Sequence, residues 1–481
     1  MNQTLQITLL LNDELLTVDV PPGMVALDFL RKQRQLTGSK EGCKEGDCGA
    51  CTVIVGELQN SQVRYRPMTS CLLPMGELHG KHLVSIEGLN MEQLSPVQSA
   101  MVECGGTQCG YCTPGFIVAM TAGLMDETIP LSEKGHDFAT SGNLCRCTGY
   151  RSIKQAGQQA FRTLEPDLSG RKSRIKALCS AKALPKHFLD AAEKLCCIPQ
   201  RKQILPPDSE YTGPIVAGGT DLFVQKGEEI PDTFPQLLNQ KAISPALESD
   251  GVIRIDARSS FEAFARDPVI QEAIPNILKY NDLIASWPIR TRASLGGNIC
   301  NASPIADMTC LLLALEAELV IFGDSGKRIV PLQNFYLGYK TLAKKGDELI
   351  AEIRFPKPKR NERINWSKVS KRKILDIASV NSAAKIEAEG ETIKQAIISL
   401  GGVAATPLAL NQTSRFLQGA SLSSSTILEA LSVAQNEISP ISDVRGSAIY
   451  KRLLARQLIA QHFVNLFPDT ISEEAVCEAL R

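Results

Sequence analysis

Eight of the fifteen cysteines fall into two compact groups within the first 150 residues. The first group has the spacing C-x4-C-x2-C…C and consists of Cys43, Cys48, Cys51 and Cys71. The second group has the spacing C-x2-C…C-x-C and consists of Cys109, Cys112, Cys145 and Cys147. The first spacing is that of a plant-type [2Fe–2S] site, in which four thiolates hold a one-electron centre. The chain is therefore predicted to carry electrons.

Zinc is the alternative for both groups, because it also binds four thiolates and C-x2-C pairs. Zinc sites usually contain two similar pairs, whereas the first group places three cysteines in one loop with Gly46 and Gly49. Glycines let a backbone fold tightly around a compact cluster and direct N–H groups at its sulfurs. The first group is therefore interpreted as a [2Fe–2S] site. The spacing of the second group alone leaves a cluster and zinc equally open.

The segments around the first group predict a small mixed sheet with one helix. Residues 6–20 alternate partly in polarity around Asn12 and Asp13, which predicts a β-hairpin. Residues 25–36 have the apolar spacing of a helix, and residues 52–55 and 83–86 are predicted to be strands. We therefore expect a ferredoxin-like β-grasp domain over residues 1–90, with the cysteine loop at its edge.

The next segment, residues 91–165, is predicted to be a helical domain. Ser95 and Pro96 have the residue types of a helix start, and residues 115–125 and 153–164 have helical patterns. The second cysteine group then lies just before two of these helices. Because helix N-termini favour thiolate, this placement supports a second cluster over zinc.

The rest of the chain is predicted to be α+β. Residues 166–205 are rich in lysine and arginine and are expected to form a linker that contains some helix and ends near Pro206. A cofactor-binding domain is expected over residues 206–380 and a C-terminal cap over residues 381–481. The expected fold class is thus an α+β multidomain chain with a β-grasp domain, a helical bundle, a cofactor-binding α+β domain and an α+β cap.

Two glycine pairs mark the predicted cofactor domain. Gly218-Gly219 follows a short apolar strand, and Gly296-Gly297 lies among small polar residues. Both pairs would let backbone N–H groups approach a phosphate, although a tight turn is the alternative for each. The chain has no G-x-G-x-x-G fingerprint, so a Rossmann-type dinucleotide site is not supported.

The composition excludes several classes of partner. The formal net charge is zero, which argues against nucleic acid and against an anionic membrane surface. There is no run of 18 apolar residues, and the N-terminal residues lack the pattern of a secretory signal. We therefore expect a cytoplasmic protein. Cysteines stay reduced in the cytoplasm, so the two cysteine groups are not interpreted as disulfides.

These motifs together resemble the iron–sulfur and flavin subunits of bacterial xanthine dehydrogenases, in the molybdenum hydroxylase (xanthine oxidase) family. The resemblance extends from end to end of the chain. Besides the first cysteine group, the matching segments are 107–115, 143–151, 217–221, 293–298, 302–307, 401–407 and 442–447. The segments around Cys109 and Cys145 are specific to this family and imply that the second group also holds a [2Fe–2S] cluster.

The resemblance implies a flavin domain of the vanillyl-alcohol oxidase (PCMH) type, which binds FAD without a Rossmann fingerprint. Its diphosphate loop would consist of Ile215, Val216, Ala217, Gly218, Gly219, Thr220 and Asp221. The remaining FAD positions would be Ser294, Gly297, Asn298, Asn301, Asp307, Ile350 and Lys368. Gln108 and Cys147 would face the pterin of a partner subunit.

The resemblance also implies an electron-transfer role. A purine would be hydroxylated at molybdenum on a large molybdopterin-binding subunit, so this chain would carry no catalytic residue of its own. Electrons would pass through the Cys109 cluster and then the Cys43 cluster to FAD and NAD+, and a heterotetramer of two small and two large subunits is expected. The alternatives are the equivalent subunit of an aldehyde, nicotinate or carbon monoxide dehydrogenase, and a non-enzymatic electron-transfer flavoprotein.

Overall fold

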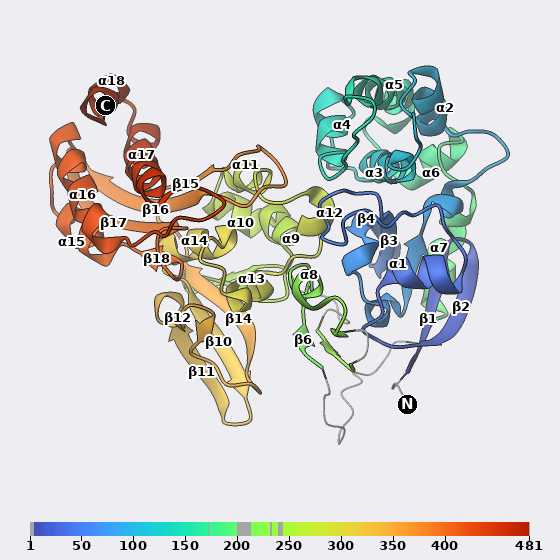
Figure 1. The fold of residues 1–481 in the computed structure, drawn as a ribbon, viewed down its shortest axis with the longest axis horizontal. Coiled ribbons are helices and arrows are strands. Elements are labelled where there is room, and N and C mark those ends of the chain that lie inside the picture. Colours follow the sequence, from blue (N-terminus) through green and yellow to red (C-terminus); the bar gives the residue numbers. More distant parts are fainter. Residues whose placement is uncertain (1–3, 172, 200–212, 231–232, 239–243, 481) are drawn as a thin grey trace. The chain divides into compact units, whose positions relative to one another are not determined.

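The computed structural model describes residues 4–171, 173–199, 213–230, 233–238 and 244–480 (Figure 1). The predicted boundary at Pro206 lies outside these residues. The chain divides into two compact units, one of which combines Met1–Ala242 with Ser286–Arg292. The other combines Ile243–Ala285 with Ala293–Arg481.

The first unit begins with a five-stranded mixed sheet in the order β2-β1-β5-β3-β4. Its strands are β1 (Leu5–Leu11), β2 (Glu14–Val20), β3 (Thr52–Gln59), β4 (Gln62–Thr69) and β5 (Lys81–Val84). The predicted hairpin is confirmed, with Asn12 in the left-handed region (φ 55°) at its turn. The predicted helix is shorter than expected: α1 (Ala26–Asp28) continues as a π-helical turn that ends at Gln33.

A helical domain follows the sheet in the same unit. Its helices are α2 (Pro96–Glu103), α3 (Thr113–Met125), α4 (Glu133–Ala139) and α5 (Arg151–Leu168). Ser95 forms the predicted cap of α2. Its hydroxyl accepts a hydrogen bond from the Gln98 N–H, and the Gln98 side chain accepts one from the Ser95 N–H. Helix α3 is buried on all sides from Gly115 onward, which makes it the centre of this domain.

The segment expected to be a linker contains two helices that pack into the first unit. They are α6 (Arg174–Ser180) and α7 (His187–Cys196). Leu178 and Phe188 join the core of the helical domain, and Ala191 packs with Leu10 of the sheet. Arg174 is buried and donates to carbonyls near the end of α3, including those of Asp126 (2.8 Å) and Ile129 (3.0 Å).

The first unit is completed by short elements from the glycine-rich region. Strands β6 (Ile215–Val216) and β7 (Gln236–Leu237) pair in parallel, and α8 (Leu222–Lys226) follows the first of them. Helix α12 (Trp287–Arg290) comes from the separate segment Ser286–Arg292. Trp287 packs into the core of the helical domain, which anchors this segment.

The second unit contains two sheets. The first has the order β11-β10-β14-β9-β8, formed by β8 (Leu247–Ser249), β9 (Val252–Asp256), β10 (Glu318–Gly323), β11 (Gly326–Pro331) and β14 (Leu349–Pro356). The helices of this half are α9 (Phe261–Arg266), α10 (Pro268–Ala273), α11 (Ile277–Asn281), α13 (Leu295–Asn301) and α14 (Asp307–Ala314). Between β11 and β14 in the sequence, β12 (Tyr336–Gly338) and β13 (Thr341–Leu342) form a separate two-stranded hairpin.

The second sheet of this unit has the order β15-β16-β17-β18 and belongs to the C-terminal half. Its strands are β15 (Glu362–Val369), β16 (Val380–Glu389), β17 (Thr392–Gly401) and β18 (Leu408–Ala409). The helices around it are α15 (Asn411–Leu417), α16 (Ser424–Glu437), α17 (Ala448–Leu466) and α18 (Glu473–Leu480) (Figure 1). The predicted mixed α+β class is confirmed. Among the described helices, none has the length and apolar character needed to cross a bilayer.

Candidate cluster and flavin sites

The first cysteine group lies in a loop that its glycines shape. Gly46 (φ 79°) and Gly49 (φ 66°) adopt left-handed backbone, which glycine reaches at little cost. The Glu45 N–H donates to Cys43 Sγ at 3.3 Å. Hydrogen bonds from the Cys48 thiol and from this backbone lower the pKa of the Cys43 thiol to about 5. The same bond raises the pKa of the Cys48 thiol, so it is the backbone N–H groups around Cys43 that favour the thiolate a cluster requires.

The second cysteine group spans two helix starts, as predicted. Cys109 and Cys112 precede α3, and Cys145 and Cys147 precede α5. Cys145 is buried, Cys112 is half-buried, and Cys109 and Cys147 are exposed. The group therefore has one side directed into the protein and one side at its surface.

The thiols in both groups come together in twos. In the first group, the Cys48 thiol donates to Cys43 and the Cys71 thiol to Cys51. In the second group, Cys147 Sγ lies 3.6 Å from Cys109 Sγ, and the Cys112 thiol donates to Cys145.

Pairing in twos is what a [2Fe–2S] cluster needs, because each of its two irons takes two protein thiolates. A zinc ion would draw four ligands around one point. Among the described residues, no three His, Cys, Asp or Glu side chains converge closely enough to hold a single metal ion. The pairing of the cysteines thus fits two binuclear clusters.

The two cysteine loops contact each other directly. The Leu144 N–H donates to the Cys48 carbonyl at 3.0 Å, and the Asn143 side-chain amide donates to the Gly49 carbonyl at 3.1 Å. Glycine is required at this junction, because a Cβ on Gly49 would lie 2.4 Å from Asn143 Nδ2. One backbone hydrogen bond therefore connects a cysteine of the first group to the residue before Cys145 of the second.

The first glycine pair forms a loop whose amides are available to a ligand. Gly219 has φ 70°, and its carbonyl accepts the Phe223 N–H at the start of α8. Within the described residues, the N–H groups of Gly218, Gly219 and Thr220 make no hydrogen bond. Successive unused N–H groups of this kind suit a diphosphate.

A buried arginine, Arg292, donates a hydrogen bond to a carbonyl of this loop. Arg292 is 3% exposed and donates to Glu77 at 2.8 Å and 3.4 Å, and to the Gly218 carbonyl at 2.7 Å. Its Nε has no partner, which costs about 1–3 kcal/mol for a buried donor. Sequence reasoning missed both Arg292 and Glu77, since residues 215 positions apart give no local signal.

The second glycine pair is used for packing, contrary to the expectation that its amides would approach a phosphate. It lies in the first turn of α13, capped by Ser294. The N–H groups of Leu295, Gly296 and Gly297 already donate to Ser259 O (3.0 Å), Ala257 O (2.7 Å) and Ser294 Oγ (3.1 Å). A Cβ on Gly296 would lie 2.9 Å from the Ala257 carbonyl, so glycine here permits close contact with another backbone segment.

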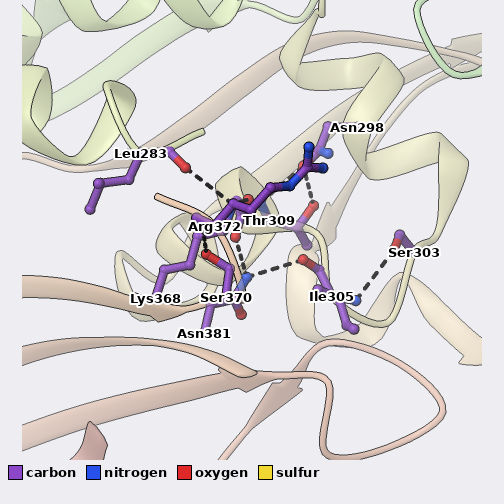
Figure 2. A network of polar contacts seen from close by, with 10 residues as sticks. Leu283, Asn298, Ser303, Ile305, Thr309, Lys368, Ser370, Arg372 and Asn381 are labelled. Carbon is purple, nitrogen blue, oxygen red and sulfur yellow. Dashed lines mark hydrogen bonds and ion pairs between the residues drawn. The ribbon is translucent and has the colours of Figure 1, made fainter. Parts of the chain in front are cut away.

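A polar network in the second unit brings together three of the predicted FAD residues (Figure 2). Lys368 has a side chain 2% exposed and donates to Asp307 Oδ2 at 2.8 Å and to the Leu283 carbonyl at 3.2 Å. Asn381 donates to the other oxygen of Asp307 at 2.5 Å. The Asn298 side-chain oxygen accepts from the Thr309 N–H at 3.2 Å. Thr309 and Asn381 were missed by sequence reasoning, because neither belongs to a glycine-rich segment.

A pocket of about 250 Å³ opens beside this network. Its lining consists of Leu283, Lys368, Val369, Ser370, Arg372 and Lys373. Three of these six residues are cationic, but Lys368 is paired with Asp307 and Arg372 lies 3.7 Å from Asp376. Lys373 has no ion pair among the described residues, so it is the cation of this pocket that is open to an anionic group.

Other predicted positions lie apart from this network. Lys340 Nζ donates hydrogen bonds to the backbone carbonyl and to the side-chain oxygen of Asn301. Ile350 is buried on β14 and pairs with Ile321 of β10. Gln108 is exposed next to Cys109. The loop 215–221 belongs to the first unit, whereas Ser294, Gly297, Asn298 and the remaining FAD positions belong to the second.

Four family models match the chain in the order of its domains. They are a 2Fe-2S iron-sulfur cluster binding domain (residues 9–75) and a [2Fe-2S] binding domain (85–158). These are followed by an FAD binding domain in molybdopterin dehydrogenase (208–358) and a CO dehydrogenase flavoprotein C-terminal domain (366–466). The first two contain all eight cysteines, and the third contains both glycine pairs.

Known proteins match along most of the chain. Xanthine dehydrogenase 1 of Arabidopsis thaliana is 28% identical over 89% of this chain and 37% of its own length. Human aldehyde oxidase is 26% identical over 93% of this chain and 38% of its own length. The chain thus spans just over a third of these relatives. Among solved structures, a carbon monoxide dehydrogenase chain from Hydrogenophaga pseudoflava has 26% identity and a TM-score of 0.50, covering 52% of this chain and 88% of that one.

Proposed function

Since its four domains make this chain an iron–sulfur and FAD electron-transfer module of the molybdenum hydroxylase family, we propose that it is the small subunit of a xanthine dehydrogenase. It would receive electrons from purine hydroxylation on a separate large molybdopterin-binding subunit and deliver them to NAD+. The observation that carries the electron route is the direct contact of the two cysteine loops, through Leu144 and Cys48.

The exposed side of the second cysteine group supports electron entry there. Cys109 and Cys147 are exposed, and Gln108 beside them is exposed with a free amide able to bond a pterin edge. The first group, in contrast, has Cys51 and Cys71 buried. We therefore propose that the partner's pterin approaches Gln108 and Cys147, and that electrons move inward from that surface.

The open amides of Gly218, Gly219 and Thr220 in the first unit would hold the diphosphate of FAD. When bound, FAD exchanges single electrons with clusters and a hydride with nicotinamide. The chain's own residues contribute positioning and charge, because the buried Lys368 ammonium can stabilise negative charge on a neighbouring ring.

An NAD+ acceptor is supported by the pocket beside Lys368. Arg372 and Lys373 line it, and guanidinium and ammonium groups suit the diphosphate of a dinucleotide. The expected assembly is a heterotetramer with two copies each of the small and large subunits.

A second candidate is the same module in an enzyme that oxidises aldehydes. The match to human aldehyde oxidase, at 26% identity over 93% of the chain, is nearly as strong as that to xanthine dehydrogenase. The substrate site would lie on the partner in either case, so both candidates assign the same roles to this chain.

The test is to purify the complex through a tag on this chain and add substrates without oxygen. Bleaching of the cluster absorbance by xanthine or hypoxanthine, followed by NADH formation when NAD+ is added, supports the proposal. Bleaching by an aldehyde alone identifies the second candidate. A chain that binds no molybdopterin subunit and shows no substrate-dependent bleaching contradicts both.

A further inference from the structure

The segment Ser286–Arg292 docks onto the first cluster domain although both of its sequence neighbours belong to the second unit. Ile289 packs on Gly46, where an added Cβ would lie 2.4 Å from Ile289 Cδ1. The Thr291 hydroxyl donates to the Pro67 carbonyl at 2.9 Å. Arg292 ends the segment with its ion pair to Glu77. The segment is thus attached at three places along the first cluster domain.

Arg292 also reaches the predicted diphosphate loop. One guanidinium nitrogen donates to the Gly218 carbonyl at 2.7 Å and to Glu77 Oε1 at 3.4 Å. Arg292 therefore joins two structures directly, the domain that holds Cys43 to Cys71 and the loop with the open amides. It also immediately precedes Ala293 and Ser294 in the sequence, where the second glycine segment begins.

The space between the first cluster and this loop is filled by packed side chains. Cys51 and Cys71 share one buried apolar cluster with Val216 and Phe223, which flank the glycine pair. The two thiols that would hold one iron therefore lie in the same core as the loop. An electron leaving that iron would pass through packed apolar side chains, over a distance that depends on the position of the loop.

Stability alone does not account for a charged pair at this position. Replacing a buried ion pair by apolar residues of similar volume is often neutral or stabilising. Here the pair also leaves Arg292 Nε without a partner. A guanidinium can donate to a carboxylate and to a carbonyl at the same time and so link the two in a fixed geometry, which an apolar side chain cannot do.

We propose that Arg292 is a positioning residue that sets the distance between the first cluster and FAD. The inference rests on the proposed flavin site. The cluster held by Cys43, Cys48, Cys51 and Cys71 would supply electrons one at a time, and FAD held at the Gly218 loop would accept two of them together with protons from solvent. Arg292 acts by holding the Gly218 carbonyl and Glu77 together.

The test compares Arg292→Lys and Glu77→Gln with the parent chain and with Arg328→Lys. Arg328 is a matched control, because it too binds a carboxylate through two nitrogens (Glu348, 2.7 Å each) and donates to a carbonyl (Ala343, 2.6 Å). Iron content is measured first, then the FAD dissociation constant by flavin fluorescence. In half-reduced protein, the electron-spin relaxation of the flavin radical then reports its distance from the reduced first cluster.

We expect Arg292→Lys to keep its iron while the FAD dissociation constant rises at least tenfold and the relaxation enhancement falls at least threefold. Glu77→Gln should change both in the same direction, and Arg328→Lys should change neither. Unchanged FAD binding and relaxation in Arg292→Lys overturn the inference, as does loss of the iron-loaded fold in both variants, which would assign the pair to stability. A parent chain that binds no FAD instead overturns the proposed flavin site.

Discussion

The Leu144 N–H donates to the Cys48 carbonyl at 3.0 Å, so the two cysteine groups are one hydrogen bond apart along the backbone. Cys48 belongs to the first group, and Leu144 is bonded to Cys145 of the second. Asn143 supports the same junction through the Gly49 carbonyl. Two one-electron centres held this way would exchange electrons through fixed, packed backbone.

Asn143→Ala should loosen this junction without unfolding it. The Gly49 carbonyl would still accept from Thr52 N and Thr52 Oγ1, so the expected loss is about 1 kcal/mol in the free energy of unfolding of the first unit. The magnetic interaction between the two reduced clusters should also weaken in electron paramagnetic resonance spectra. Asn361→Ala, which removes an exposed bond to Glu387, is the control and should change neither quantity. An unchanged interaction in folded Asn143→Ala would show that Leu144 alone holds the junction.

Cys43→Ser should remove one of two cluster signals and leave the other. The two groups are held by different elements, a loop beside the sheet in one case and helix starts in the other. Iron analysis should fall from about four to about two atoms per chain. Cys196→Ser is the control, since Cys196 is exposed at the end of α7 and belongs to neither group. Loss of both signals from a soluble, folded variant would contradict two independent sites.

The cysteine groups, the capped helix at Ser95 and the hairpin at Asn12 were predictable because each depends on residues close in sequence. Arg292 and Glu77 were not, since their pairing appears only when the chain has folded. The Gly296 amide was misread for the same reason: its acceptor is the Ala257 carbonyl, almost 40 positions earlier. The helices in the segment 166–205 left a detectable signal, because Phe188, Ala191 and Leu195 share one face of α7.

Gly219→Ala should weaken FAD binding at least tenfold while both clusters remain. Gly219 has φ 70°, and a Cβ there would lie 2.9 Å from the Phe223 ring, so the loop must move away from its present shape. Gly251→Ala is a matched control with φ 72° and no atom within 4 Å of its Cβ. The control should cost about 1 kcal/mol in stability and leave FAD binding unchanged. Equal FAD binding in the two variants would argue against this loop as the diphosphate site.

The second unit should lose stability as the pH falls from 6.5 to 5. Burial lowers the pKa of His462 to about 3, so the folded state stays neutral while the unfolded state takes up a proton below pH 6.5. The stability present above pH 6.5 is therefore lost on acidification, at up to about 1.4 kcal/mol per pH unit.

His462→Gln isolates this effect, because the other four histidines of the chain lie in the first unit. Urea unfolding can be followed through Trp366 in a Trp287→Phe background, since the chain has two tryptophans, one in each unit. The variant should be less stable at pH 7, where it lacks the bonds to Asn365 and Ser382, but its stability should change less between pH 6.5 and 5. A slope equal to that of the parent would mean that His462 takes up its proton equally in the folded and unfolded states, which contradicts a lowered pKa.

Anaerobic reductive titration of the purified chain tests the central claim most directly. Two [2Fe–2S] clusters accept one electron each and FAD accepts two, so the account predicts four electrons per chain. Loss of flavin absorbance and two distinct cluster signals should accompany them. Uptake of two electrons or fewer by a chain carrying its full iron and FAD, or zinc bound at the second cysteine group, would contradict the account.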